Sequence, residues 1–140
     1  MTEYHKIQTV WLREPKDKHR TLIENAWSKP EFEYLADSLW DITEKVDGMN
    51  MRVIWDGTTQ TIAGRTDNAQ IPPKLLARME ELFPPLVFTQ GLDGDFPPCV
   101  IYGEGYGAKI QKGGGNYIRD GQDFIVFDAT INGRWLDRNE

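Results

Sequence analysis

The stretch "TEKVDGMNMRVIWDG" (Thr43–Gly57) joins a charged, extended segment to a strongly apolar one. Asp47-Gly48 predicts a turn, and Met51–Trp55 is predicted as a buried strand because β-branched and aromatic residues favour strands. Asp56-Gly57 is a hairpin signal between this strand and a second β-prone run that ends at Arg65. The stretch therefore predicts antiparallel sheet, and it places an amine, Lys45, directly before a tight turn.

The rest of the chain adds one clear helix and two more buried strands. The segment "PPKLLARMEELF" (Pro72–Phe83) places apolar residues on one helical face, and Pro84-Pro85 ends the helix. Two strands are predicted in "CVIYGE" (Cys99–Glu104) and "DFIVFDA" (Asp123–Ala129), and Asn132-Gly133 then makes a tight turn into a last short strand. The predicted fold class is α+β, mostly antiparallel sheet with one or more short helices.

The first forty residues predict less. "REPKDKHR" (Arg13–Arg20) is predicted as a solvated charged loop, and Thr21–Trp27 is predicted as a helix. Ser28 is a candidate cap, with Pro30 in the first turn, for a short helix through Glu31–Leu35. The sequence contains no internal repeat and no low-complexity linker, so residues 1–140 are expected to belong to one domain.

Composition excludes several classes of protein. The 140 residues are 39% hydrophobic and 11% aromatic, which is enough for a packed core. With 16 basic and 22 acidic residues the net charge is -6, the wrong sign for holding nucleic acid by bulk electrostatics. Cys99 is the only cysteine, so neither a disulfide framework nor a thiolate metal cluster is predicted. The sequence has no signal peptide and no apolar run long enough to span a membrane, which favours a cytoplasmic protein.

Several short segments are interpreted as ordinary structure. "KGGGN" (Lys112–Asn116) lacks the lysine and hydroxyl that complete a phosphate-binding loop, so it is interpreted as a turn. "LDGDF" (Leu92–Phe96) lacks the later ligands of a calcium loop and is also interpreted as a turn. His5 and His19 have no partner at metal-ligand spacing. The sequence therefore assigns no metal ligand.

Four short segments, taken in order, carry more information than any one of them. They are Lys45–Asn50, Arg65 within "AGRTDN", Gly103–Gly107 and Phe124–Asp128. In this order they resemble motifs I, Ia, III and IIIa of the covalent nucleotidyltransferase superfamily of ligases and capping enzymes. The closest resemblance is to its phage-type RNA ligase family. It implies the N-terminal portion of an adenylation domain, built of mostly antiparallel sheet around an ATP cleft.

The resemblance implies a reaction and a set of roles. The motif I lysine, Lys45, would attack the α-phosphorus of ATP, expel pyrophosphate and become a lysyl-AMP, before RNA ends are joined. Glu44 would recognise adenine. Asn50 and Arg65 would position the ribose and phosphates, and Glu104 would hold a ribose hydroxyl. ATP and Mg²⁺ or Mn²⁺ are the implied cofactors, and RNA ends are the implied substrate.

Phe127 would stack on the purine in the same resemblance, and strand alternation then places Val126 and Asp128 on the opposite side of the sheet. Lys45, Arg65, Glu104 and Phe127 are together expected to line one concave cleft.

The resemblance also leaves out two motifs. Motif IV, an acidic motif that helps bind the metal, and motif V, with paired lysines that contact the α-phosphate, have no match in the sequence. Three interpretations remain open: a fragment or short form of an RNA ligase, half of a split ligase that needs a second chain, or a catalytically degenerate module that binds nucleotide or RNA.

Overall fold

The computed structural model describes residues 3–90 and 96–137. Contacts divide the chain into two compact units, one made of residues 1–4 and 45–140 and the other of His5–Glu44. The larger unit contains every predicted site residue except Glu44. The predicted "LDGDF" turn falls mainly on residues 91–95, outside the described ranges.

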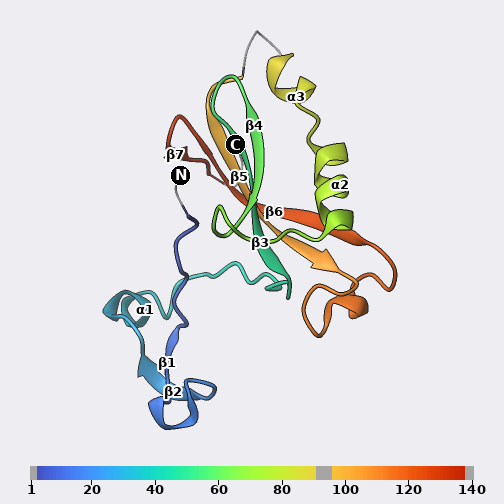
Figure 1. Cartoon of the computed structure of the whole chain (residues 1–140). Coiled ribbons are helices and arrows are strands. Elements are labelled where there is room, and N and C mark those ends of the chain that lie inside the picture. Colours follow the sequence, from blue (N-terminus) through green and yellow to red (C-terminus); the bar gives the residue numbers. More distant parts are fainter. Residues whose placement is uncertain (1–2, 91–95, 138–140) are drawn as a thin grey trace. The chain divides into compact units, whose positions relative to one another are not determined.

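The larger unit is built on a five-stranded antiparallel sheet (Figure 1). Its spatial order is β4-β3-β5-β6-β7, so β4 is one edge strand and β3, which precedes it in the chain, lies inside it. The bounds are β3 (Met49–Trp55), β4 (Gln60–Gly64), β5 (Cys99–Gly107), β6 (Gln122–Ile131) and β7 (Arg134–Trp135). The predicted α+β class is confirmed, as are both strands after the helix and the two hairpin turns.

Local chemistry explains the hairpins. In the β3–β4 turn the Asp56 carboxylate accepts hydrogen bonds from the backbone N–H groups of Thr58 and Thr59, each at 2.8 Å. In the β6–β7 turn Asn132 and Gly133 have φ angles of 50° and 79°, the left-handed pair that a tight two-residue hairpin requires. Asn and Gly adopt that conformation at little cost, which is why the sequence predicted this turn.

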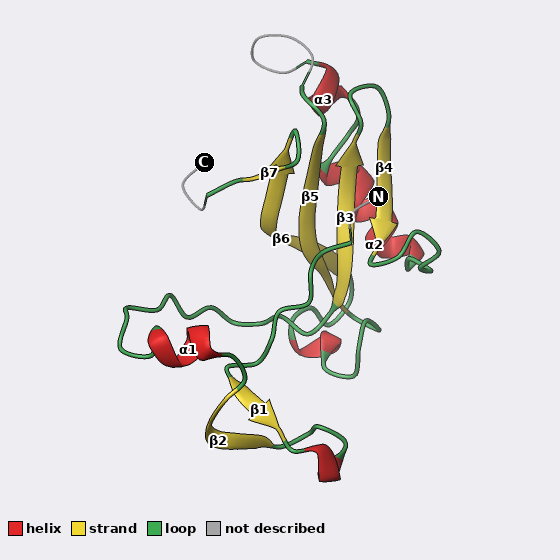
Figure 2. Cartoon of the chain, turned by 90° about the vertical axis from the view of Figure 1, so that its left-hand side faces the viewer, coloured by secondary structure: helices red, strands yellow, loops and turns green. Residues whose placement is uncertain are grey.

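The core lies between one face of the sheet and the helices α2 (Pro73–Leu82) and α3 (Leu86–Thr89), and Figures 1 and 2 show α2 alongside that face. Leu75 and Met79 of α2 are fully buried. The β3 residues that meet this side are every second one, as expected for a strand with one buried face. The apolar core comprises Met51, Val53, Trp55, Leu75, Met79, Phe88, Cys99, Ile110 and Phe124.

The His5–Glu44 unit corrects two predictions. Residues Leu22–Trp27 form the strand β2, paired with β1 (Trp11–Arg13), so the predicted helix over Thr21–Trp27 is wrong. Asn25 has a φ of 60°, which a right-handed helix cannot accommodate, and cross-strand pairing provides the backbone partners instead. The predicted charged loop between these strands holds a 3-10 turn over Pro15–Asp17.

The helix that follows, α1 (Pro30–Tyr34), begins at the predicted proline. Its cap differs from the prediction, because Lys29 occupies the N-cap position without a side-chain hydrogen bond. Ser28 instead donates its hydroxyl to the Thr9 carbonyl, which ties the end of β2 to the chain before β1.

Candidate active site

The five-stranded sheet has one face covered by α2 and a second that we call the open face. A Cβ added at Gly105 would lie 2.3 Å from Leu75 Cδ2 and 3.2 Å from Met51 Cγ, so these residues face the helix. Their neighbours along the strands face the other way. Asn50 pairs with Glu104 and Arg52 pairs with Tyr102 on this open face.

Glu104 lies at the centre of the predicted site. Burial raises the pKa of its carboxyl above the usual value, while the nearby charge of Lys45 and a hydrogen bond from the Gly48 backbone N–H act in the opposite direction. The charge of Asp47 raises the pKa further. The segment around Lys45 and the strand that carries Glu104 thus meet, as the order of the motifs predicted. Lys45 itself is exposed, in the extended chain before β3.

The turn at Asp47-Gly48 packs tightly against β5. A Cβ at Gly48 would lie 2.2 Å from the Gly105 carbonyl oxygen, so only glycine fits this approach. The loop after β5 holds the turn from the other side. Gln111 Nε2 donates to the Gly48 carbonyl at 3.0 Å, and the Asp47 N–H donates to the Tyr117 hydroxyl at 3.2 Å. The glycine-rich run in that loop forms a short 3-10 helix over Gly114–Asn116.

Asn50 and Arg65 lie beside Glu104 on the open face. Asn50 Oδ1 is buried and accepts no hydrogen bond from the described residues, which leaves an acceptor available at the site. Arg65 directly follows Gly64, the register partner of Met51, so alternation places it next to Asn50 on the open face. Its side chain is 60% exposed and lies 3.9 Å from the Glu3 carboxylate.

Phe127 lies on the open face and is 46% exposed. It is the extra residue of a bulge, because Val126 pairs with Gly103 whereas Asp128 pairs with Tyr102. A bulge opposes two residues of one strand to a single residue of its partner. The Tyr4 ring packs edge-on to Phe127 with centroids 4.8 Å apart, and the Tyr4 hydroxyl donates to Asp128 Oδ2 at 3.1 Å.

The bulge corrects one prediction. Asp128 does not lie opposite Phe127 across the sheet, because one tyrosine contacts both side chains. The expected position of Val126 agrees with its pairing to Gly103, a residue whose added Cβ would meet the buried Phe124 ring at 2.3 Å.

Tyr4 joins an aromatic cluster on the open face. Its ring lies 5.2 Å from that of Tyr102 and 5.7 Å from that of Trp135. Burial first, and then the hydrogen bond to Asp128, raise the pKa of Tyr4 to about 12. Tyr4 gave no signal in the sequence, because a tyrosine near the N-terminus matches no motif and its partners are about a hundred residues away.

The predicted residues therefore lie on or beside one face of the sheet, and the expectation that they line one concave cleft stays a prediction. Lys45, Asn50, Arg65, Glu104 and Phe127 lie on or beside the same side of three strands. Glu44 ends the other unit of the chain, so its role in adenine recognition stays a prediction.

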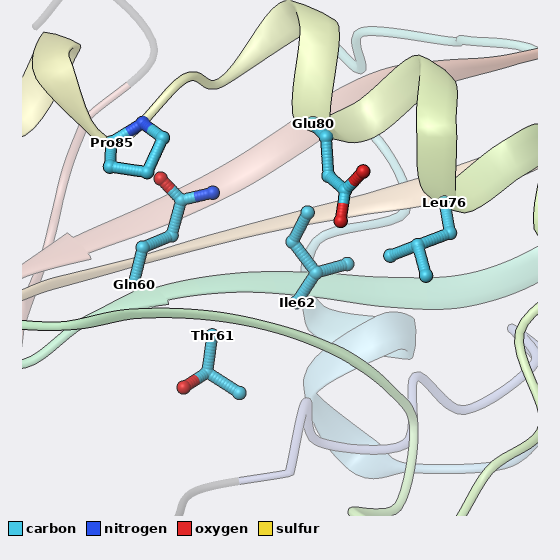
Figure 3. Close-up of a pocket in the computed structure, with 6 residues that line it drawn as sticks. All are labelled: Gln60, Thr61, Ile62, Leu76, Glu80 and Pro85. Carbon is cyan, nitrogen blue, oxygen red and sulfur yellow. The ribbon is translucent and has the colours of Figure 1, made fainter.

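A hollow of about 490 Å³ lies elsewhere, between β4 and the α2 helix (Figure 3). Gln60, Thr61, Ile62, Leu76, Glu80 and Pro85 line it. Glu80 is its one ionisable lining residue, and no predicted site residue reaches it. We favour the open face as the active site, since charged and hydrogen-bonding groups from distant segments converge there.

Three further observations concern metal ligands, the single cysteine and membrane-spanning helices. Within residues 3–90 and 96–137 no three His, Cys, Asp or Glu side chains gather as metal ligands. Burial raises the pKa of the Cys99 thiol, which disfavours the thiolate needed for nucleophilic chemistry. Among the helices described, none has the length and apolarity to cross a membrane.

A comparison with protein-family models shows the family of this chain. A family model described as RNA ligase matches residues 38–140, which include all the predicted site residues. The chain belongs to the RNA ligase family. Comparison with curated protein sequences finds no match.

Two solved structures of an RNA ligase from Naegleria gruberi share the fold. One is a mutant with ATP and Mn; its TM-score is 0.51 at 25% identity, over 68% of this chain and 27% of that one. The other holds PPi and gives the same TM-score and identity, over 68% of this chain and 28% of that one. This family member thus spans little more than a quarter of the length of the ligases it matches.

Proposed function

We propose that this RNA ligase family member binds ATP on the open face of its sheet and that Lys45 is the residue that accepts AMP. In the complete reaction the lysyl-AMP passes its adenylate to an RNA end, and two RNA ends are then joined. The observation that carries the proposal is the meeting of Lys45, Gly48 and Asn50 around the half-buried Glu104.

The first step of the proposed reaction requires the Lys45 amine as a nucleophile beside the bound ATP. The Nζ lone pair attacks the α-phosphorus of ATP, a nitrogen–phosphorus bond forms, and the bond to the pyrophosphate oxygen breaks. The ammonium must lose its proton before attack, because only the neutral amine has a free lone pair. The Asp47-Gly48 turn, pinned by Gln111 and Tyr117, fixes the backbone next to this nucleophile.

The neighbouring groups suit the parts of a nucleotide. Asn50 Oδ1 and the Glu104 carboxylate are acceptors for ribose hydroxyls, and Arg65 presents an exposed guanidinium for phosphate. Phe127 presents an exposed ring for the purine. Glu44 is assigned to adenine by the resemblance alone. Asn50, Glu104, Arg65 and Phe127 would together form a nucleoside site with more hydrogen-bond acceptors than positive charges.

Mg²⁺ or Mn²⁺ would balance the charge of the phosphates in this reaction. The described residues offer no assembled set of protein ligands for the ion. Magnesium commonly keeps several waters and uses substrate phosphates as ligands, so a protein cage is not required. We assign no residue to the metal.

A split enzyme is the second candidate, and the outer edge of β6 favours it. β7 pairs only with Thr130 and Ile131, and among the described residues no strand continues this pairing toward Gln122. Ile125, Val126 and Phe127 on that stretch are each 45% to 49% exposed. Open apolar strand edges are sites for pairing with another chain. A second polypeptide carrying motifs IV and V would complete both the sheet and the charge around the α-phosphate.

Intact mass after incubation with ATP and magnesium tests the proposal. Each missing charged group can cost ~3 kcal/mol in transition-state stabilisation, a factor of ~100 in rate. We therefore expect little AMP on the isolated chain and no RNA sealing. Adding a polypeptide that carries motifs IV and V should restore attachment of one AMP. ATP binding without AMP attachment, even with that polypeptide, would favour the degenerate nucleotide-binding module instead.

A further inference from the structure

Arg52 is a buried cation on the open face that the proposed chemistry does not use. Its side chain is 1% exposed, and it extends from β3 toward the end of β4. Arg52 Nε donates to the Gly64 carbonyl at 2.9 Å, and Nη2 donates to Asp67 Oδ1 at 2.8 Å. One guanidinium thus binds the chain on both sides of Arg65.

The turn held in this way is compact. The Ala69 N–H donates to the Thr66 carbonyl at 3.1 Å, which closes the turn after Arg65. A Cβ at Gly64 would lie 2.5 Å from the Ala69 Cβ, so the returning chain packs directly on the glycine. Arg65 itself is 60% exposed and depends on this turn for its place beside Asn50.

An arginine suits this role better than any other residue. Its planar fork directs several N–H donors in fixed directions, whereas a lysine offers one point charge on a flexible stem. Burying a charge is costly, and the Asp67 side chain is 57% exposed, so their attraction is weakened by solvent. The two hydrogen bonds of Arg52 fix the direction of the chain on either side of Arg65, which is a geometric role rather than a gain in charge stabilisation.

We propose that Arg52 and Asp67 are positioning residues that orient Arg65 toward the phosphates of bound ATP. The inference rests on the proposed function, because it takes Arg65 as a phosphate contact. It adds two residues to the site. ATP affinity should depend on them, because ATP carries the triphosphate, and adenosine affinity should not.

The test uses Asp67→Ala, which removes the hydrogen bond from Arg52 Nη2 to Asp67 Oδ1 and leaves the apolar core unchanged. Affinities for ATP and for adenosine are measured by calorimetry on the wild-type chain and its variants. Asp67→Ala should weaken ATP binding roughly 2- to 100-fold, the range of direct couplings between neighbouring residues, and leave adenosine binding unchanged. Asp67→Asn keeps an oxygen acceptor and should retain more ATP affinity than Asp67→Ala.

Two further variants separate positioning from general weakening. In an Arg65→Ala background, Asp67→Ala should cause no additional loss of ATP affinity, since its effect passes through Arg65. Asp120→Ala is the matched control, because Asp120 is an exposed aspartate that pairs with Lys74 at 3.1 Å. It should change neither affinity.

The outcomes are distinguishable. Equal losses of ATP affinity from Asp67→Ala with and without Arg65, or equal losses for ATP and adenosine, would overturn the positioning role while leaving ATP binding intact. A wild-type chain that binds neither ligand would overturn the proposed function and this inference together.

Discussion

The two faces of the five-stranded sheet are made by the same strands, but one packs into the core and the other carries the predicted site residues. On β3, Met51, Val53 and Trp55 point into the core under α2, whereas Asn50 and Arg52 point to the open face. The covered face is apolar and closely packed. The open face carries a buried arginine, a half-buried glutamate, a buried amide oxygen with no partner among the residues that the structure describes, and partly exposed aromatic rings.

Side chains alternate between the two faces along each strand, so the residues that stabilise the core and the residues proposed to bind ATP lie on opposite faces of the same strands. A change on the covered face removes packing, which stabilises the fold by area buried from water. A change at Lys45, Asn50, Glu104 or Phe127 on the open face removes a group that we assign to ligand binding or catalysis. Substitutions on the two faces should therefore affect different measurements.

The largest effect should come from Lys45→Ala. With a polypeptide that carries motifs IV and V present, the wild-type chain should gain one AMP in its intact mass and the variant none, because the nucleophile is gone. The exposed side chain makes no core contact, so the thermal unfolding midpoint should not change. Lys74→Ala, on α2 at the other face, is the control and should attach AMP normally. AMP attachment to Lys45→Ala would show that another residue is the nucleophile.

A change on the covered face should produce the opposite pattern. Met79 is fully buried, so Met79→Ala should lower the free energy of unfolding by about 2–5 kcal/mol through lost packing and a residual cavity. Chemical denaturation measures this loss, and ATP affinity of the folded fraction should be unchanged. Leu82→Ala on the same helix, where the side chain is 37% exposed, should cost clearly less. Similar losses from both variants would contradict the burial argument.

Phe127 and Val126 give a comparison within one strand. They are 46% and 49% exposed and lie on opposite faces, so the two variants compare two partly exposed apolar side chains of the same strand. Phe127→Ala should weaken ATP binding by about 1 kcal/mol or somewhat more, a typical value for an aromatic contact. Val126→Ala should leave it unchanged in the same calorimetric titration. Equal losses from the two would remove Phe127 as the purine platform.

Glu104→Gln tests whether ionisation of the half-buried Glu104 carboxyl lowers the stability of the fold. Because the folded-state pKa of Glu104 is raised, the folded protein binds this proton more tightly than the unfolded chain does. Protonated Glu104 therefore stabilises the fold fully at pH values below its pKa in the unfolded chain. This stabilisation is lost as the pH rises through its pKa in the folded protein. Gln cannot ionise, so the stability of Glu104→Gln minus that of the wild type should be larger at pH 7 than at pH 4. Unfolding midpoints at both pH values measure this small difference, and a reversed order would contradict it.

The sequence predicted the sheet because its local signals agree with the tertiary structure. The hairpin at Asp56-Gly57, the turn at Asn132-Gly133 and the apolar face of Pro73–Leu82 each specify one conformation. It failed at Leu22–Trp27, where pairing with Trp11–Arg13 determines the structure and no local feature distinguishes a strand from a helix.

The candidate site was predictable only where motifs carry it. Lys45, Asn50, Arg65 and Glu104 are predicted through the resemblance, and the structure pairs Asn50 with Glu104, which no local feature of the sequence indicates. Arg52 looked like an ordinary strand residue, because its partners Gly64 and Asp67 become visible only once β3 and β4 are paired. The bulge at Phe127 was missed because the sequence contains no glycine or proline there to signal one.

The most direct test of the account is an amide NMR titration of the isolated chain with ATP. The account predicts shifts at Gly48, Asn50, Arg65, Glu104 and Phe127 on the open face and little change at Leu75 and Met79 under the sheet. Adenosine should reproduce the shifts at Phe127 but not those at Arg65. Shifts confined to Gln60, Ile62 and Leu76, which line the hollow between β4 and α2, would contradict the central claim that ATP binds the open face.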